Sequence, residues 1–216
     1  MPVRYRQNNI MGTIDHEIGT HFLRRYNEKF QVWAGKRSKH EVKNCIRTEE
    51  GFAQVNQMVR TALNPNGYPY LYKAALNYYM AFKASQMSFL ELFYDIEKYI
   101  DDRYQRWKYV VRVKRGLMDT SEPGGLYKDQ VYLEGSIGIL KERHTLDFQA
   151  LCCGKISMQI MKQLAEAKKL KKDCIKIPPF MRNMEEYLRA LDRIAKLNFI
   201  DEHLAEAQAK ITQDAE

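Results

Sequence analysis

The sequence predicts a mainly α-helical fold, and three observations support this prediction. Apolar residues recur at helical spacing through most of the 216 residues. Strand signals, which would be short runs of alternating apolar and polar residues, are weak throughout. Glycine and proline turn signals fall between the helical stretches. The composition, 45% hydrophobic and 29% charged, is that of an ordinary globular chain with a sizeable core.

The first two helices are expected on either side of a polar loop. One helix spans residues 10–27, and the loop covers residues 28–47. The second helix should begin at Thr48, a favoured N-cap residue, and its apolar side chains follow at helical spacing. It should end before the turn sequence NPNG at residues 64–67.

A third helix, expected over residues 69–83, is rich in tyrosine. Its tyrosines would suit either an aromatic binding pocket or the protein core. The spacing of the apolar side chains is that of a helix core, which we therefore expect to contain Leu71, Ala75, Tyr78, Tyr79 and Phe82.

Two further helices should come next. Ser88 and Glu91 form a capping box, which opens the first of them. The second is a basic helix over residues 102–115. Gly116 should end it, because glycine readily takes the left-handed conformation that closes many helices.

The rest of the chain is also expected to be helical. A glycine-rich loop over residues 119–125 precedes a helix over residues 128–142. Two more helices, separated by Pro178-Pro179, should fill the C-terminal third.

The net charge of +8 favours acidic partners, which include nucleic acid, an anionic membrane and an acidic polypeptide. Part of this charge comes from a lysine run that, taken alone, is most simply a solvated helix face: Lys168, Lys169, Lys171 and Lys172. No nucleic-acid-binding fold is recognisable, and no stretch approaches the roughly 20 apolar residues that span a bilayer. The first residues contain no apolar h-region, so we do not expect them to be a secretory signal. We therefore expect neither a nucleic acid nor a membrane as partner.

The four cysteines are Cys45, Cys152, Cys153 and Cys174. They form no C-x-x-C pair, and two of them are adjacent, which suits neither a disulfide framework nor a zinc finger. Reduced thiols in a cytoplasmic protein are the expectation.

The most informative motif is HEIGTH, which begins at His16 and ends at His21. Two histidines and a glutamate can hold a zinc ion and place a general base beside it. An α-helix turns about 100° per residue, so histidines five apart diverge unless a π-bulge brings them together. Gly19 would tolerate such a backbone. The alternative is an ordinary amphipathic helix with Ile14, Ile18 and Phe22 facing the core.

The segment RTEEGFA offers a third metal ligand. Many catalytic zinc sites take a glutamate from a second helix and leave the fourth position to water. Gly51 and Ala53 are small enough to let that helix approach the first one closely. The spacing does not decide between Glu49 and Glu50, and both would also suit the positive end of a helix dipole.

Taken together, HEIGTHFLRRYNE and RTEEGFA resemble the microtubule-associated tyrosine carboxypeptidases, metallopeptidases that remove the C-terminal tyrosine of α-tubulin. The resemblance continues through LNPNGYPYLYKAALNYYMAFKASQMSF and VKRGLMDTSEPGGLYKDQVYLEG, covers about residues 10–150, and then thins. A group of bacterial proteins named for a Q-E-G-L-A motif is more distantly similar.

The resemblance implies a zincin-like helical metallopeptidase with one Zn²⁺ per chain. Its metal ligands fall on His16, His21 and Glu50, and its catalytic glutamate falls on Glu17. Zinc would activate a water molecule, and Glu17 would act as general base and then return the proton to the leaving amine. The expected partners are the α-tubulin C-terminal tail and microtubules, at the cytoskeleton.

The resemblance also bears on domain organisation. Family members carry a substantial region upstream, so we expect a single catalytic domain over 1–216 that lacks its N-terminal portion. Within it we expect the zinc-site helices over 10–63, a helical body with a substrate-side loop over 64–150, and C-terminal helices over 151–216.

A carboxypeptidase must also bind a terminal carboxylate, usually with a cation. Lys114, Arg115 and Lys128 flank the glycine-rich loop and are the candidates. Tyr132 lies one helical turn after Lys128 and is a candidate donor to the oxyanion. Each residue has a structural alternative, since the first two suit the C-terminal dipole of their own helix and Tyr132 suits half-buried packing.

The sequence offers three candidates for the carboxylate that orients a ligand histidine: Asp15, Glu49 and Asp129. His144 is a further site candidate. Two other functions also fit the sequence: a non-catalytic tubulin- or microtubule-binding module, and a metallopeptidase that acts on another acidic tail.

Overall fold

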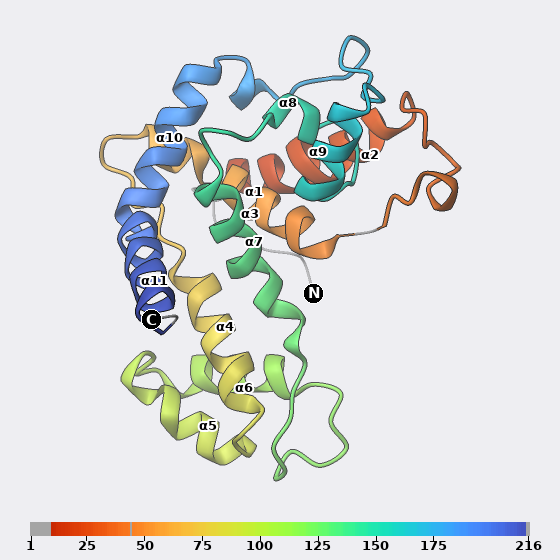
Figure 1. The fold of residues 1–216 in the computed structure, drawn as a ribbon. Helices are drawn as coiled ribbons and strands as arrows, with labels where there is room; N and C mark the ends of the chain where they lie inside the picture. The colour runs from red at the N-terminus through yellow and green to blue at the C-terminus, as the bar shows by residue number, and fades with distance from the viewer. Residues whose placement is uncertain (1–9, 44, 215–216) are drawn as a thin grey trace. The chain divides into compact units, whose positions relative to one another are not determined.

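The computed structural model describes residues 10–43 and 45–214, with side chains described as far as residue 207. Within these ranges the chain is helical and contains no strand, which confirms the mainly α prediction (Figure 1). Its elements are α1 (Ile10–His16), η2 (Glu17–Phe22), α2 (Leu23–Glu28), η3 (Ser38–His40), α3 (Ile46–Leu63), α4 (Tyr72–Ala84), α5 (Phe89–Asp95), η4 (Ile96–Lys98), α6 (Arg103–Lys114), η5 (Tyr127–Asp129), α7 (Gln130–Lys141), α8 (Phe148–Leu151), α9 (Met158–Glu166), η6 (Pro179–Met181), α10 (Met184–Leu197) and α11 (Ile200–Asp214). None of the described helices is both long and apolar enough to cross a bilayer.

The chain divides into two compact units. The first combines the residues up to Tyr70 with those from Glu134 onward, and the second comprises Leu71–Leu133. Compactness alone does not define a domain, so the expected division at residues 64 and 151 stays a prediction.

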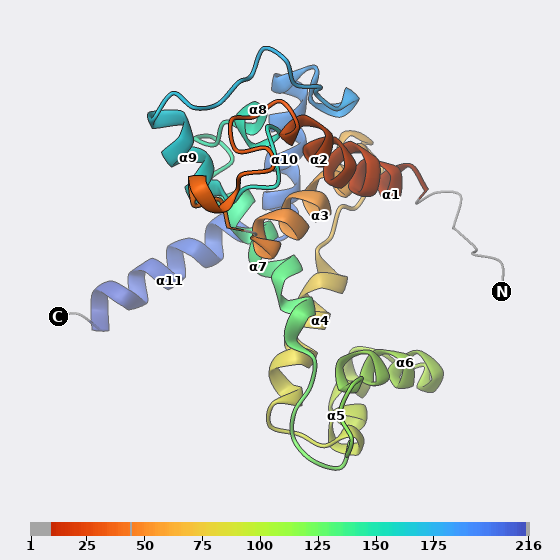
Figure 2. The same ribbon diagram turned by 90° about the vertical axis from the view of Figure 1, so that its right-hand side faces the viewer.

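In the first unit, α3 is the central helix, and both α1 and α10 pack against it (Figures 1 and 2). The aromatic side chains of Phe52, Phe148 and Tyr187 meet in this core, with ring centroids 6.1 and 5.1 Å apart along the series. Helix α3 is therefore anchored from two sides, which fixes the position of its first two turns, where Glu49 and Glu50 lie.

Two glycines let α3 cross α7 at close range. A Cβ atom on Gly51 would lie only 2.1 Å from the carbonyl carbon of Gly135. The sequence predicts that Gly51 and Ala53 let α3 approach the first helix closely, and for Gly51 this prediction is wrong. The close approach of α1 to α3 depends instead on Gly12, whose Cβ would lie 2.8 Å from the backbone oxygen of Gln57.

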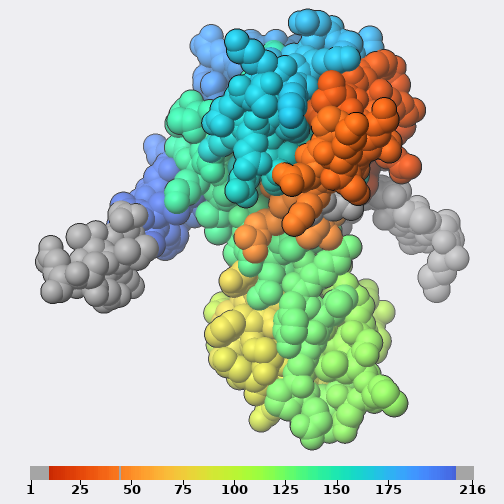
Figure 3. All heavy atoms as spheres, turned by 45° about the vertical axis from the view of Figure 1, so that its right-hand side comes forward, coloured from red at the N-terminus to blue at the C-terminus, as the bar shows by residue number. Residues whose placement is uncertain are grey.

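The loop after α2 lies against the segment around α9, more than a hundred residues further along the chain (Figure 3). Asn27 is fully buried and donates to the backbone carbonyls of Cys152 and Lys176, 2.9 and 2.8 Å away. Gln31 exchanges two hydrogen bonds with the backbone of Lys171. These contacts tie the C-terminal part of the chain to the helix that carries the histidines.

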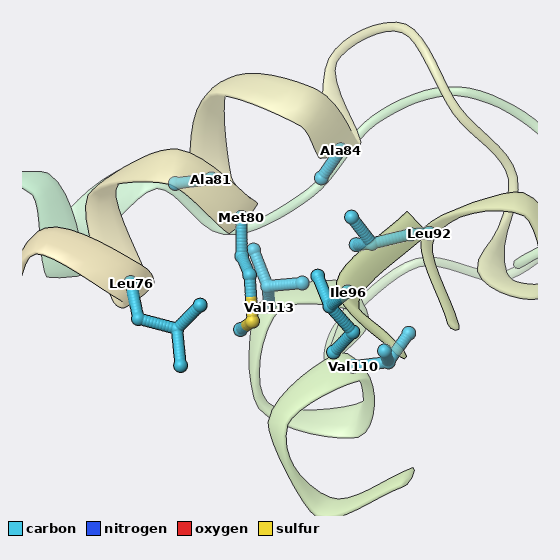
Figure 4. Packing of buried hydrophobic residues seen from close by; sticks show 8 residues of the cluster. All are labelled: Leu76, Met80, Ala81, Ala84, Leu92, Ile96, Val110 and Val113. Atoms are coloured by element: carbon cyan, nitrogen blue, oxygen red, sulfur yellow. The ribbon is translucent and has the colours of Figure 1, made fainter. Parts of the chain in front are cut away.

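The second unit has a core of its own, in which α4, α5 and α6 meet (Figure 4). The core is made of Leu76, Met80, Ala81, Ala84, Leu92, Ile96, Val110 and Val113. The predicted capping box of Ser88 and Glu91 is present at the start of α5. Gly116 follows α6 with φ +88°, as its predicted role requires.

Three expectations about these helices are wrong. Helix α3 begins at Ile46 with Cys45 as N-cap, and Thr48 is buried inside the first turn. The chain after Pro178-Pro179 holds two helices, because Phe199 takes a left-handed φ of +54° between α10 and α11. On α4 the buried face lies about one residue away from the expected one, so Phe82 is 52% exposed.

Candidate metal centre

The two histidines lie on a helix that changes its winding between them. Helix α1 ends at His16, the π-helical turn η2 runs from Glu17 to Phe22, and α2 continues from Leu23. The π-bulge that the H-E-x-x-x-H spacing predicted is therefore confirmed. Its wider turn brings the rings of His16 and His21 to 4.9 Å between centroids.

Gly19 contributes to the bulge differently from the expectation. Its φ is not among the positive values, so backbone freedom is not what the position requires. A Cβ atom there would instead lie 2.8 Å from Cε1 of Phe180. A larger side chain would therefore displace the ring of Phe180, which covers this part of the turn.

A chain of buried side chains holds the bulge in place. The Thr20 hydroxyl donates to the carbonyl oxygen of Asp15 at 2.9 Å, across the start of the widened turn. Asn56 on α3 donates to the Thr20 hydroxyl at 3.0 Å, and Tyr187 on α10 donates to Asn56 at 2.7 Å. All three side chains are at most 1% exposed. Three helices thus fix the turn between the histidines.

His16, His21 and Glu50 form a group that could hold a metal ion. Oε2 of Glu50 lies 3.8 Å from Nε2 of His16 and 3.5 Å from Nε2 of His21. One donor atom from each residue lies within 4.8 Å of the others, and all three residues are half-buried. The side chain of Glu17 is 61% exposed beside them, with Oε1 3.9 Å from Nε2 of His16.

Glu49 lies on the other side of His21. The Nδ1 atom of His21 lies 2.5 Å from Oε1 of Glu49, so the ring hydrogen-bonds to the carboxylate through one nitrogen and turns the other toward Glu50. Among the three carboxylates that the sequence left open, Glu49 is the one beside a histidine. Asp15 pairs with Arg60, and Asp129 pairs with Arg112.

Two cationic side chains, Arg24 and Lys155, form ion pairs with Glu49. Arg24 is 1% exposed, forms an ion pair with Glu49, and donates to the carbonyls of Leu151 and Ile156 at 3.0 and 2.7 Å. The ammonium of Lys155 lies 3.0 Å from Oε1 of Glu49. Sequence reasoning missed both cations. Arg24 lies in the segment HEIGTHFLRRYNE, eight residues after His16, but nothing in its spacing indicates a partner on α3.

These contacts shift the pKa values of Glu49, His21 and His16. Burial alone would raise the pKa of the Glu49 carboxyl, but Arg24, His21 and Lys155 outweigh it and hold that pKa at about 2. Burial would lower the pKa of His21, but hydrogen bonds to Glu49 and Glu50 raise it to about 9. For His16, burial and the neighbouring His21 both lower the pKa. Without a metal, the two histidines therefore differ in protonation.

The candidate substrate-binding residues all belong to the second unit. Lys114 is 1% exposed, and its ammonium donates to the carbonyls of Ala84, Met87 and Glu122, which favours its structural role. Arg115 and Lys128 are exposed, and Tyr132 is half-buried. Their proposed roles in substrate binding and oxyanion stabilisation stay predictions.

The remaining candidates occupy ordinary structural positions. His144 is 59% exposed, and its Nε2 lies 2.9 Å from Asp192. All four cysteines are free, and burial raises the pKa values of Cys152 and Cys153 to about 12. Neither thiol is activated as a nucleophile.

Comparison with known proteins identifies the family. The sequence model described as "Microtubule-associated tyrosine carboxypeptidase" matches residues 2–202. Microtubule-associated tyrosine carboxypeptidase 1 of mouse is 41% identical over 200 residues, which are 91% of this chain and 41% of that protein. The human protein of the same name is 40% identical with the same coverage.

A second relative is the mouse protein described as putative tyrosine carboxypeptidase MATCAP2, 41% identical over 196 residues, which are 89% of this chain and 36% of that protein. The chain thus spans about two fifths of the length of these curated relatives. The matched region contains the candidate metal centre, and the chain belongs to the microtubule-associated tyrosine carboxypeptidase family.

Proposed function

We propose that the chain is a zinc carboxypeptidase that removes the C-terminal tyrosine from α-tubulin tails. The observation that carries this proposal is the convergence of His16, His21 and Glu50 across a π-bulge, with Glu17 exposed beside them. A purely structural metal site has no need of an exposed glutamate next to its ligands.

The donor set suits zinc. Two imidazole nitrogens and one carboxylate oxygen form a catalytic zinc set, which leaves one position open. At zinc–ligand bonds of about 2.1 Å, tetrahedral donors lie roughly 3.4 Å apart. The separations of 3.5 and 3.8 Å between Glu50 and the two imidazoles are close to that value. Glu49 supplies the second hydrogen bond that ligand histidines commonly make.

The proposed chemistry assigns separate tasks to the metal and the side chains. A bound zinc ion supplies Lewis-acid activation of a water molecule and of the scissile carbonyl. The exposed carboxylate of Glu17 accepts the proton of the attacking water and delivers it to the amine of the leaving tyrosine. His16, His21 and Glu50 hold the ion, and the hydrogen bond from His21 to Glu49 fixes that ring.

The substrate is proposed from the family. Two relatives are named microtubule-associated tyrosine carboxypeptidase 1, which indicates a peptidase for terminal tyrosine that associates with microtubules. The net charge of +8 suits an acidic tail, since complementary charge speeds encounter. We propose the α-tubulin tail and the microtubule as the partners of this chain.

The test is intact-mass analysis of α-tubulin after incubation with the zinc-loaded chain, beside its Glu17→Gln variant. We expect the wild type alone to remove one tyrosine residue. Equal removal by both proteins would contradict the role of Glu17. No removal by a wild type that holds one zinc ion would contradict the substrate assignment. Peptides that end in Tyr, Phe or Glu then distinguish this activity from that of a peptidase for another acidic tail.

A further inference from the structure

Helix α6 carries basic side chains and no acidic one. The basic residues are Arg103, Arg106, Lys108, Arg112 and Lys114. Two of them, Arg106 and Lys114, are buried and serve the core of the second unit. The others point to solvent. Their charge is therefore available on the surface of this unit.

A groove of about 590 Å³, here called the α6 groove, runs along this helix. Its cationic lining consists of Lys108 and Arg112 on α6, Arg115 at the C-cap of that helix, and Lys73 from α4. Lys108 and Arg112 are four positions apart and share a helix face, and Arg115 follows three positions later, so the three cations continue one line. At 1.5 Å per residue, that line is roughly 10 Å long.

The excess of positive charge in the α6 groove is not cancelled. None of the described residues that line it is acidic. Asp129 pairs with Arg112 from below, with oxygens 2.5 and 3.1 Å from Nε and Nη2, but its side chain is only 7% exposed. Arg112 and Arg115 remain 46% and 42% exposed. Oδ2 of Asp129 also lies 4.0 Å from Nη1 of Arg115. Asp129 thus pairs with two of the groove's cations, but it presents little negative surface to solvent.

We propose that the α6 groove binds a carboxylate-rich peptide segment. In an extended peptide, side chains two residues apart point the same way and lie roughly 6.6 Å apart. Two or three alternate glutamates would therefore match the length of the cation line. Arginine adds paired donors that fit a carboxylate. The choice of carboxylates over nucleic-acid phosphates rests on the proposed function.

The binding test uses a fluorescein-labelled octaglutamate without tyrosine, so that no cleavage is involved. Its affinity is measured by fluorescence anisotropy for the full chain and for two matched double variants. Lys73→Gln with Lys108→Gln alters the groove. Lys169→Gln with Lys171→Gln removes the same charge from the exposed lysine run elsewhere.

The groove variant should bind octaglutamate about fivefold more weakly, since each exposed ion pair contributes about 0.5 kcal/mol. The lysine-run variant should bind nearly as the wild type does. Equal weakening in both variants would overturn the proposal, because it would indicate a diffuse field rather than a groove. Tighter binding of an oligothymidylate than of octaglutamate would also overturn it. Lys108 lies over the ring of Tyr104, 4.2 Å from its centroid. Lys73→Gln alone therefore serves as the variant that leaves this contact intact.

The two proposals, peptide binding in the α6 groove and peptidase activity, can be contradicted independently. Octaglutamate binding without removal of tyrosine from any peptide would contradict the proposed function but not the proposed binding in the groove. Cleavage of a tyrosine-ended peptide without octaglutamate binding would overturn the proposed binding in the groove but not the proposed function.

Discussion

Oε1 of Glu49 lies 2.5 Å from Nδ1 of His21, and this contact joins the bulged helix to α3 behind the candidate metal centre. Glu49→Gln keeps the shape of the side chain but removes its charge. We expect zinc affinity to fall about 10- to 100-fold, as is typical when the partner of a ligand histidine is lost. Competition with a zinc chelator measures the change.

The matched control is the neighbouring residue. Glu50→Gln removes a proposed ligand and should lower zinc affinity more than Glu49→Gln does. An unchanged affinity in Glu49→Gln, or a greater loss there than in Glu50→Gln, would contradict this division between orienting and ligating carboxylates.

Zinc binding should release a proton from His21. Burial would lower the pKa of this ring, but Glu49 and Glu50 raise it to about 9, above the ordinary value of 6.5. The metal-free ring is therefore protonated at about pH 7.5, whereas zinc binds neutral imidazole. Calorimetric titration with zinc in buffers of different ionisation enthalpy should show release of roughly one proton. Heats that do not depend on the buffer would refute the protonation of His21.

The hydrogen-bond chain from Tyr187 through Asn56 to Thr20 should stabilise the π-bulge. Tyr187→Phe leaves the buried amide oxygen of Asn56 without its donor, which should lower the free energy of unfolding by about 1–3 kcal/mol. Urea denaturation measures the loss. Tyr68→Phe is the control, because Tyr68 is 69% exposed. Equal stability of Tyr187→Phe and the wild type would show that these hydrogen bonds do not stabilise the bulge.

Lys114 should act as a structural residue. Its ammonium donates to three backbone carbonyls, one of them at 3.0 Å in the loop residue Glu122, so Lys114→Met would leave buried acceptors unpaired. We expect a loss of about 1–3 kcal/mol in unfolding free energy without any substrate. Lys128→Met, on an exposed side chain, should leave stability nearly unchanged. A normal stability of Lys114→Met together with a raised KM would restore its candidacy for substrate binding.

The sequence predicted the bulge because two histidines five residues apart diverge on a regular α-helix and can share a metal ion only if the winding changes between them. It could not choose between Glu49 and Glu50, since adjacent residues differ only in the direction in which the helix turns their side chains. In the structure, Glu50 lies between the two imidazoles, whereas Glu49 lies behind His21. That distinction depends on where α3 crosses the bulged helix.

The sequence could not predict the long-range polar contacts, nor which apolar face of a helix is buried. Arg24 reaches carbonyls 127 and 132 residues away, and no local pattern encodes such partners. The alternative that placed Ile14, Ile18 and Phe22 in the core is wrong, because they are 42%, 54% and 57% exposed. Helical spacing identifies an apolar face, but not whether that face meets the core.

Anomalous diffraction at the zinc edge, from crystals of the zinc-loaded chain, tests the proposed metal centre most directly. We expect one peak per chain, bounded by Nε2 of His16, Nε2 of His21 and Oε2 of Glu50. A peak beside other residues, or no peak at this position in crystals that contain zinc, would contradict the proposed zinc site.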